Sequence, residues 1–270
     1  MTTTSASTTT APLTAAADTY TLGGKTFSSR LILGSGKFSL PLVKAVAEQG
    51  EAQIITLALR RATPDGKENI LDYMPKDVTL LPNTSGARTA EEAVRIAELS
   101  RAMGCGDFVK VEIISDARWL LPDNQETIRA TKMLADRGFV VLPYMYPDYY
   151  ATKALEDAGA SAIMPLAAPI GSNRGLCTKA FIEIVLKSTD LPVIVDAGIG
   201  KPSEACEAME MGVTAIMCNT AIATAGNVEQ MCRAFKLAIE AGRLAHLGKT
   251  GRVIIDQAAA SSPLTGFLGE

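Results

Sequence analysis

Short β-branched runs alternate with helical patterns along most of this chain, and the alternation restricts the possible fold more than any other feature. From residue 30 onward, eight runs read as strands, and segments with helical spacing separate them. The predicted strands cover residues 30–33, 54–60, 79–83, 108–114, 140–145, 162–167, 192–196 and 215–219. Eight strand–helix units in a chain of this length predict a single-domain α/β fold, the (β/α)8 TIM barrel.

The segments between the predicted strands carry their own helix signals. Thr89 and Glu92 have the spacing of a capping box, in which each side chain satisfies a free backbone N–H group at the start of a helix. Pro202 suits the first turn of another helix. Apolar residues recur at i, i+3, i+4, i+7 and i+11 near the C-terminus and predict a buried helical stripe. This stripe consists of Val228, Met231, Cys232, Phe235 and Ile239.

The competing architecture is a doubly wound open sheet. That fold would favour a G-x-G-x-x-G loop after its first strand, and the sequence has only Gly34-Ser35-Gly36 there. Polar side chains instead occur at or near the carboxyl ends of predicted strands, where barrels build their active sites. These residues are Asn83, Glu112, Asp196 and Asn219. Their positions favour the barrel.

The fourth predicted strand holds a lysine and a glutamate on the same face. Side chains alternate along a strand, so Lys110 and Glu112 point one way, and the apolar residues between them point the other. A neutral, desolvated lysine can attack a ketone and form an imine, and a nearby carboxylate can move the protons. Burial and the carboxylate act in opposite directions on the charge of Lys110, and the sequence leaves the balance open. A structural salt bridge is the alternative interpretation.

Glycine-containing loops follow the last three predicted strands. Asp196 begins one of them and leads into Ala197 and Gly198, and Asn219 begins another with Thr220. Glycine lets a backbone approach a ligand closely, and barrels commonly bind phosphate in the loops after strands seven and eight. The loop at 169–175, after strand six, could complete an anion site, although a flexible connector explains its composition equally well.

Charge and residue usage exclude several classes of function. The net charge of -3 argues against a general nucleic-acid or anionic-membrane surface, and no apolar run is long enough to span a bilayer. With a single histidine, His246, a Ser-His-Asp triad or a histidine-rich metal site is not expected. The five scattered cysteines suit a reducing, cytoplasmic environment. We expect neither a metal nor another cofactor.

The two ends of the chain differ in composition from the middle. Residues 1–20 are rich in Thr, Ala and Ser and predict a disordered leader, because they have neither the basic start nor the apolar stretch of a secretory signal. Residues 21–250 form the predicted barrel, and residues 251–270 form a C-terminal tail.

The ordered motifs closely resemble those of the bacterial thiazole synthases, which make the thiazole phosphate half of thiamine. The resemblance runs from about residue 34 to residue 267. The matching motifs are LPNTSGARTAEEA at 81–93, KVE at 110–112, LLPD at 120–123, VLPY at 141–144, MPL at 164–166, APIGS at 168–172, VDAGIG at 195–200, NTAIA at 219–223 and SSPL at 261–264. Their number and order make the resemblance specific. Residues 146–150 depart from the family pattern.

The resemblance implies a (β/α)8 barrel that acts on 1-deoxy-D-xylulose 5-phosphate. It implies that Lys110 forms a Schiff base with the sugar's keto group and that Glu112 and Asp196 perform acid–base steps. The backbone around Gly171, Ala197, Gly198, Asn219 and Thr220 would hold the substrate and its phosphate. Sulfur would arrive as a thiocarboxylate on the C-terminus of a small carrier protein, and a separate enzyme would supply dehydroglycine. The family also forms homo-oligomers, typically tetramers.

Two alternatives share the barrel and the phosphate loops. A class I aldolase or isomerase acting on a sugar phosphate would also use a strand lysine but no sulfur carrier. A non-catalytic barrel that binds a sugar phosphate would need no imine at all. Lys110 separates these interpretations, because only an enzyme should form a covalent adduct there.

Overall fold

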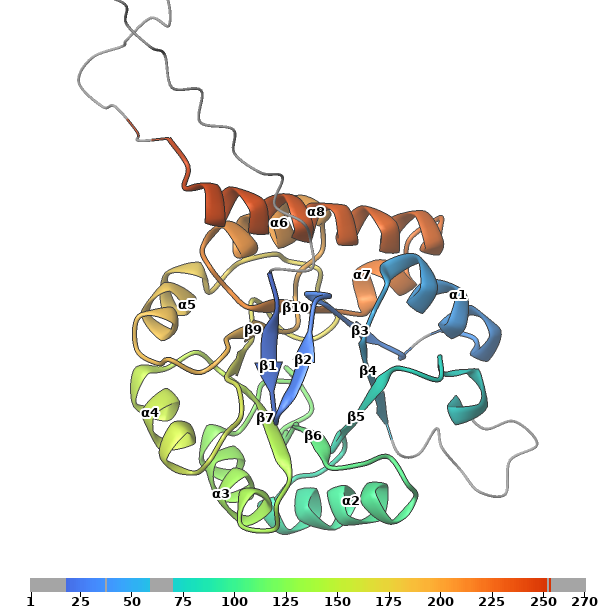
Figure 1. Cartoon of the computed structure of the whole chain (residues 1–270). Helices are drawn as coiled ribbons and strands as arrows, with labels where there is room; N and C mark the ends of the chain where they lie inside the picture. The colour runs from blue at the N-terminus through green and yellow to red at the C-terminus, as the bar shows by residue number, and fades with distance from the viewer. Residues whose placement is uncertain (1–17, 37, 59–69, 252, 254–270) are drawn as a thin grey trace, which may run out of the picture.

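The chain folds as a (β/α)8 barrel, as the alternating sequence pattern predicts (Figure 1). The protein is described here from a computed structural model, which describes residues 18–36, 38–58, 70–251 and 253. The barrel strands are β3 (Leu31–Gly34), β4 (Ile54–Ala58), β5 (Thr79–Asn83), β6 (Phe108–Val111), β7 (Val140–Met145), β8 (Met164–Pro165), β9 (Ile194–Val195) and β10 (Ala215–Cys218).

All barrel strands run parallel to their neighbours. Their order is β8-β7-β6-β5-β4-β3-β10-β9, and the register continues from β3 to β10 as well as from β3 to β4. Isolated parallel bridges pair Ile163 with Val193 and Leu166 with Asp196, so β8 and β9 meet and the ring closes. The ladders of β8 and β9 are shorter than the predicted runs at 162–167 and 192–196. One reason is that Pro165 has no N–H group to donate.

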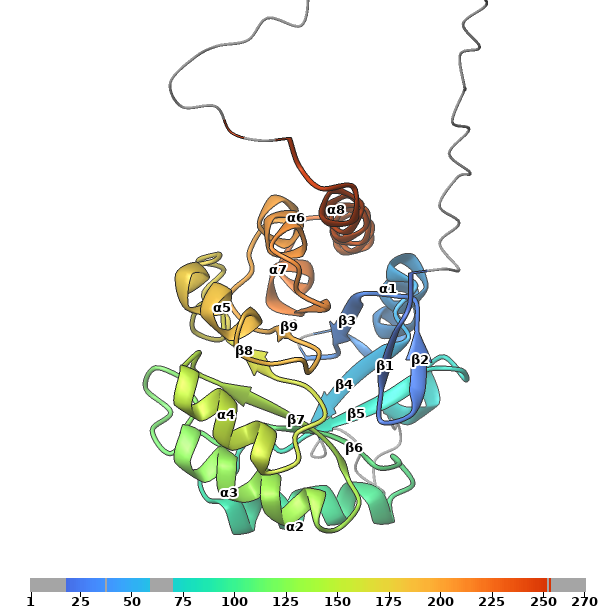
Figure 2. The same cartoon turned by 60° about the vertical axis from the view of Figure 1, so that its left-hand side comes forward.

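Helices surround this ring on its outer side (Figures 1 and 2). They are α1 (Leu40–Gly50), α2 (Ala90–Ala102), α3 (Asn124–Ala135), α4 (Tyr149–Asp157), α5 (Lys179–Leu186), α6 (Pro202–Glu210), α7 (Thr220–Ala223) and α8 (Val228–Gly248). A short 3-10 helix spans Ile70–Tyr73. Within the described ranges, no helix has the length and apolarity required to cross a membrane.

The predicted helix starts at Thr89 and Pro202 are confirmed. The Thr89 hydroxyl accepts a hydrogen bond from the Glu92 N–H group at 3.3 Å, while the Glu92 carboxylate accepts from Arg88 at 2.8 Å, one residue before the usual capping-box partner. Pro202 is the first residue of α6, and Glu204 accepts from the N–H of Lys201. The predicted stripe on α8 also faces inward, with Cys232, Phe235 and Ile239 buried.

Strand alternation separates two hydrophobic layers. On β6, Val109 and Val111 face outward and pack with residues of α2 and α3, and Ile113 just beyond the strand belongs to the same cluster. Phe108 faces inward and belongs to the cluster that fills the barrel. Lys110 therefore points into the barrel, as the sequence predicts.

An additional hairpin, which the sequence analysis did not predict, covers the amino-terminal end of the barrel (Figure 1). It consists of β1 (Tyr20–Leu22) and β2 (Lys25–Phe27), which pair antiparallel through Gly23 and Gly24. Both glycines have positive φ angles, 51° and 79°, as a tight hairpin turn with right-handed strand twist requires. The side chains of Tyr20, Leu22 and Phe27 pack with the residues inside the barrel.

The predicted leader and tail lie largely outside the described residues, which exclude 1–17, 252 and 254–270. The SSPL motif at 261–264 is also outside them. Of the leader, Asp18 contacts Arg30 and Arg243, and Tyr20 begins β1. Residues 59 and 60 of the predicted second strand are likewise not described, and β4 ends at Ala58.

Candidate active site

A cavity of about 540 Å³ lies at the carboxyl ends of the barrel strands, and it contains every residue that the sequence analysis assigned to the site. The predicted site residues that line it are Lys110, Glu112, Asp196, Gly171, Ala197, Gly198, Asn219 and Thr220. They come from four separate loops and strands, and the barrel brings them to one place. The site thus lies at the end of the barrel where such enzymes perform chemistry.

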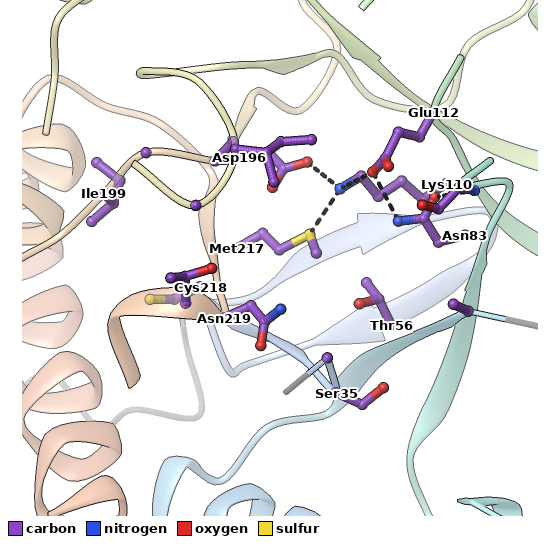
Figure 3. A pocket seen from close by; sticks show the side chains of 18 of the residues that line it. Ser35, Thr56, Asn83, Lys110, Glu112, Asp196, Ile199, Met217, Cys218 and Asn219 are labelled. Carbon is purple, nitrogen blue, oxygen red and sulfur yellow. Dashed lines mark hydrogen bonds and ion pairs between the residues drawn. The ribbon is translucent and has the colours of Figure 1, made fainter. Parts of the chain in front are cut away.

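Lys110 lies between two carboxylates inside this cavity (Figure 3). Its Nζ is 2.5 Å from Asp196 Oδ2 and 3.3 Å from Glu112 Oε2. All three residues are buried: Lys110 is 3% exposed, Asp196 is 4% exposed and Glu112 is 6% exposed. Asp196 is therefore the closer partner of the lysine, although Glu112 is its neighbour in the sequence.

Neighbouring polar groups hold Glu112 in position. The amide of Asn83, at the end of β5, donates to Glu112 Oε2 at 2.9 Å. The Thr84 hydroxyl accepts from the Glu112 N–H group at 2.8 Å and donates to the Glu112 carbonyl at 3.0 Å. Glu112 is thus fixed at both its backbone and its side chain, which suits a group that must act at one defined point.

The carboxylates decide the resting charge of Lys110, which the sequence left open. Burial alone would lower the pKa of the Lys110 ammonium, but the adjacent Asp196 and Glu112 carboxylates outweigh burial and raise it above the ordinary lysine value. Lys110 is consequently an ammonium at rest. It must lose a proton before it can act as a nucleophile.

At Asp196, by contrast, the effect of burial on the pKa outweighs the effect of the neighbouring charges. Its burial raises the pKa of the carboxyl group, and Lys110 opposes this effect without cancelling it, while the charge of Glu112 raises the pKa further. A carboxylate whose affinity for a proton is increased, 2.5 Å from an ammonium, is well suited to accept that proton. The pair can therefore generate a free amine inside the barrel.

The glycine turns bring the backbone against the cavity. Ala197 and Gly198 both have positive φ angles, 58° and 83°. A Cβ atom at Gly198 would lie 2.5 Å from the backbone nitrogen of Ala168, so only glycine fits there. Gly171 also has a positive φ, 75°. These turns place Gly171, Ala197 and Gly198 in the lining of the cavity.

Two residues that contact Lys110 were not assigned by the sequence analysis. Met217 Sδ lies 3.7 Å from Lys110 Nζ, and the Nζ lies 5.1 Å from the centre of the Tyr144 ring. Alternation along the eighth predicted strand would have placed Met217 on the same face as Asn219. Thr56 and Ser35 also line the cavity without an obvious sequence signal.

Cys218 lines the cavity as well, yet its thiol is not a reactive group there. Burial raises the pKa of the Cys218 thiol far above its ordinary value.

Comparison with known proteins gives a consistent set of relatives. The profile of the family described as "Thiazole biosynthesis protein ThiG" matches residues 21–263. The thiazole synthase of Clostridium beijerinckii is 66% identical over 251 residues, which cover 93% of this chain and 98% of that protein. The thiazole synthase of Fusobacterium nucleatum is 64% identical over the same shares of the two chains. A chain in the crystal structure of the Amycolatopsis orientalis BexX/CysO complex aligns with a TM-score of 0.78 and 31% identity, covering 87% of this chain and 98% of that one.

Proposed function

The chain belongs to the thiazole synthase family of thiamine biosynthesis, and from that premise we propose that it converts 1-deoxy-D-xylulose 5-phosphate through a Schiff base on Lys110. The observation that carries the proposal is the position of Lys110 Nζ, buried between Asp196 and Glu112 in a cavity large enough for a sugar phosphate. The thiazole phosphate moiety of thiamine is the proposed product.

The first step needs a neutral amine. Asp196 accepts a proton from the Lys110 ammonium, and the amine then adds to the keto carbon of the sugar. Loss of water from this adduct gives the iminium. Positive charge on the nitrogen acidifies the adjacent C–H bond, so a carboxylate within reach can remove that proton and move the carbonyl along the sugar. Glu112, held by Asn83 and Thr84, is the second carboxylate for these transfers.

The phosphate group belongs at the glycine turns in this proposal. Gly171, Ala197, Gly198, Asn219 and Thr220 line the side of the cavity formed by the loops after β8, β9 and β10. Their positive φ angles at 171, 197 and 198 expose backbone to the cavity. Anchoring the phosphate there would leave the keto end of the sugar free to reach Lys110.

The later steps require partners. We propose that a small carrier protein with a C-terminal thiocarboxylate delivers sulfur to the migrated carbonyl and that dehydroglycine, made by a separate enzyme, supplies the remaining atoms. The similar chain from Amycolatopsis orientalis belongs to a crystal structure of the BexX/CysO complex, and this supports a protein partner for the present barrel. A homo-oligomer, as in the family, is part of the proposal.

Reductive trapping tests the Schiff base directly. The protein is incubated with 1-deoxy-D-xylulose 5-phosphate and borohydride, and peptide mass spectrometry then locates the reduced sugar phosphate. We expect the adduct on Lys110. The matched control is Lys236→Met, because Lys236 also lies between two carboxylates, Glu51 at 3.3 Å and Glu240 at 2.8 Å, but does not line the cavity. This variant should form the adduct normally.

The same experiment discriminates among the candidate functions. A protein that binds the sugar phosphate without forming an adduct at Lys110 would be the non-catalytic barrel. If the adduct forms, addition of the carrier thiocarboxylate separates the remaining two, because a class I aldolase or isomerase would leave the thiocarboxylate intact. Transfer of sulfur to the sugar is the result expected for the thiazole synthase.

A further inference from the structure

Tyr144 is a fully buried tyrosine beside the reactive lysine, and nothing in the proposed steps uses it. It lies on β7 at 0% exposure, and its ring centre is 5.1 Å from Lys110 Nζ. A ring face at this distance from an ammonium is attractive. The ring therefore packs directly against the amine.

The ring alone would not require a tyrosine. The Tyr144 hydroxyl is buried and has no hydrogen-bond partner within the described residues. A buried hydroxyl without a partner lowers stability, so phenylalanine would fill the same space at less cost. An unpaired donor in the interior of an active-site barrel indicates a partner that arrives during the reaction.

The electrostatic surroundings keep this hydroxyl in its donor form. Burial raises the pKa of Tyr144 far above its ordinary value, and the charges of Asp196 and Glu112 raise it further. These influences also indicate that the phenol lies within electrostatic range of both carboxylates. Tyr144 is thus a neutral donor next to the groups that move protons.

We propose that Tyr144 is a further catalytic residue, whose hydroxyl donates a hydrogen bond to the sugar oxygen that is lost as water when Lys110 forms its imine. The inference rests on the proposed function, and it adds a third group to the two carboxylates. It assigns to Tyr144 a contact with the reacting oxygen.

The proton balance of this step is complete without ionising the phenol. Lys110 gives one proton to Asp196, and the resulting amine forms a C–N bond while the carbonyl electron pair moves to oxygen. That oxygen takes one proton from nitrogen and the other from Asp196, and it leaves as water from the carbon. Throughout, the Tyr144 O–H bond stays intact and stabilises the charge that develops on the oxygen.

The Tyr144→Phe variant tests this assignment, because it removes the hydroxyl and keeps the ring against Lys110. We expect the rate of borohydride-trapped adduct formation with 1-deoxy-D-xylulose 5-phosphate to fall at least about 10-fold. The sugar concentration at half-maximal rate should change little, and the thermal unfolding midpoint should stay the same or rise. The matched control is Tyr20→Phe, since the Tyr20 hydroxyl donates to the Ser29 carbonyl at 3.2 Å far from the cavity. It should lower the unfolding midpoint and leave the trapping rate unchanged.

The pH profile of trapping separates a contact with oxygen from an effect on the lysine. With the ring retained, the Tyr144→Phe profile should keep its midpoint and lose amplitude. A shifted midpoint with an unchanged plateau would mean that the hydroxyl acts on the charge of Lys110, and it would overturn the assignment. Equal rates in wild type and Tyr144→Phe would overturn this inference alone. Failure of the wild type to form any adduct would overturn both it and the proposed function.

Discussion

A buried ion cluster and a half-buried one lie at opposite ends of the same barrel, and the sign of the charge in excess differs between them. At the carboxyl end, one ammonium, Lys110, lies between two carboxylates. At the amino end, one carboxylate, Asp18, lies between two guanidinium groups. Arg243 donates to both of its oxygens at 2.9 and 2.7 Å, and Arg30 donates to both at 3.2 and 2.8 Å.

Under the proposed function, this difference separates a structural ion cluster from a reactive one. Hydrogen bonds from Arg243 and then Arg30 hold the pKa of Asp18 at about 2, so its charge is fixed at any physiological pH. At Asp196, burial outweighs the shared lysine and a backbone hydrogen bond at Ala197, so the pKa of this carboxyl group is raised. Ion pairing is present in both clusters, but the side chain of Asp196 is 5% exposed and that of Asp18 is 25% exposed. Burial and the number of donors on each carboxylate together set its affinity for a proton.

The largest effect should follow from Lys110→Met. Without the amine no imine forms, and turnover of 1-deoxy-D-xylulose 5-phosphate should fall by about four orders of magnitude or more. The measurement is thiazole phosphate formation under saturating substrates, with Lys236→Met as the control that should retain activity. Substantial residual turnover in Lys110→Met would show that both clusters are structural.

A smaller loss should follow from Asp196→Asn. The amide keeps the shape of the side chain and removes the proton acceptor 2.5 Å from Lys110. Adduct trapping should slow without being lost, since Glu112 still faces the amine, while turnover should fall by about two orders of magnitude or more because the later proton transfers also need a carboxylate there. Trapped adduct and product are measured on the same samples. Unchanged turnover would make Asp196 a structural partner like Asp18.

The smallest effect should come from Asp18→Asn, and it should be confined to stability. The folded-state pKa of about 2 lies below the ordinary value of 3.8, so the ionised carboxylate stabilises the fold above about pH 4 and loses this contribution as the pH falls toward 2. Allowing for solvent screening, we expect the free energy of unfolding at pH 7 to drop by about 1 kcal/mol. Turnover should not change.

The control for this stability measurement is Asp107→Asn. Asp107 pairs with Arg101 at 2.8 Å, but its side chain is 60% exposed, so its removal should alter the free energy of unfolding very little. Urea unfolding at pH 7 and at about pH 3 checks both variants. A stability loss in Asp18→Asn that is as large at about pH 3 as at pH 7 would contradict the ionic origin of the effect.

Much of the barrel could be predicted from the sequence because the patterns that indicate its strands and helices are local. Strand alternation and helix caps depend on neighbouring residues, and the confirmed helix starts at Thr89 and Pro202 are of this kind. The β1–β2 hairpin was missed although the signal was present, as Gly23-Gly24 separates two short alternating runs. Only Tyr20 fell within the predicted leader, and residues 21–27 were assigned to the barrel domain without a secondary-structure element of their own.

The sequence predicted which residues form the candidate site, but it did not predict the charge state of Lys110. Alternation was sufficient to place Lys110 and Glu112 on one inner face. The resting charge of Lys110 depends on its separation from Asp196, which comes from a strand 86 positions later in the chain. No local sequence pattern predicts the distance between Lys110 and Asp196. The contacts of Met217 and Tyr144 with the lysine were missed for the same reason.

The β1–β2 hairpin has a consequence for the order of events in the barrel. Because Tyr20, Leu22 and Phe27 fill its amino-terminal end, the cavity is left, among the residues that the structure describes, to open at the strands' carboxyl ends. Under the proposed function, the sugar, the sulfur donor and the product would all pass through this end of the barrel. Covalent attachment to Lys110 would then retain the sugar while the later reactants enter.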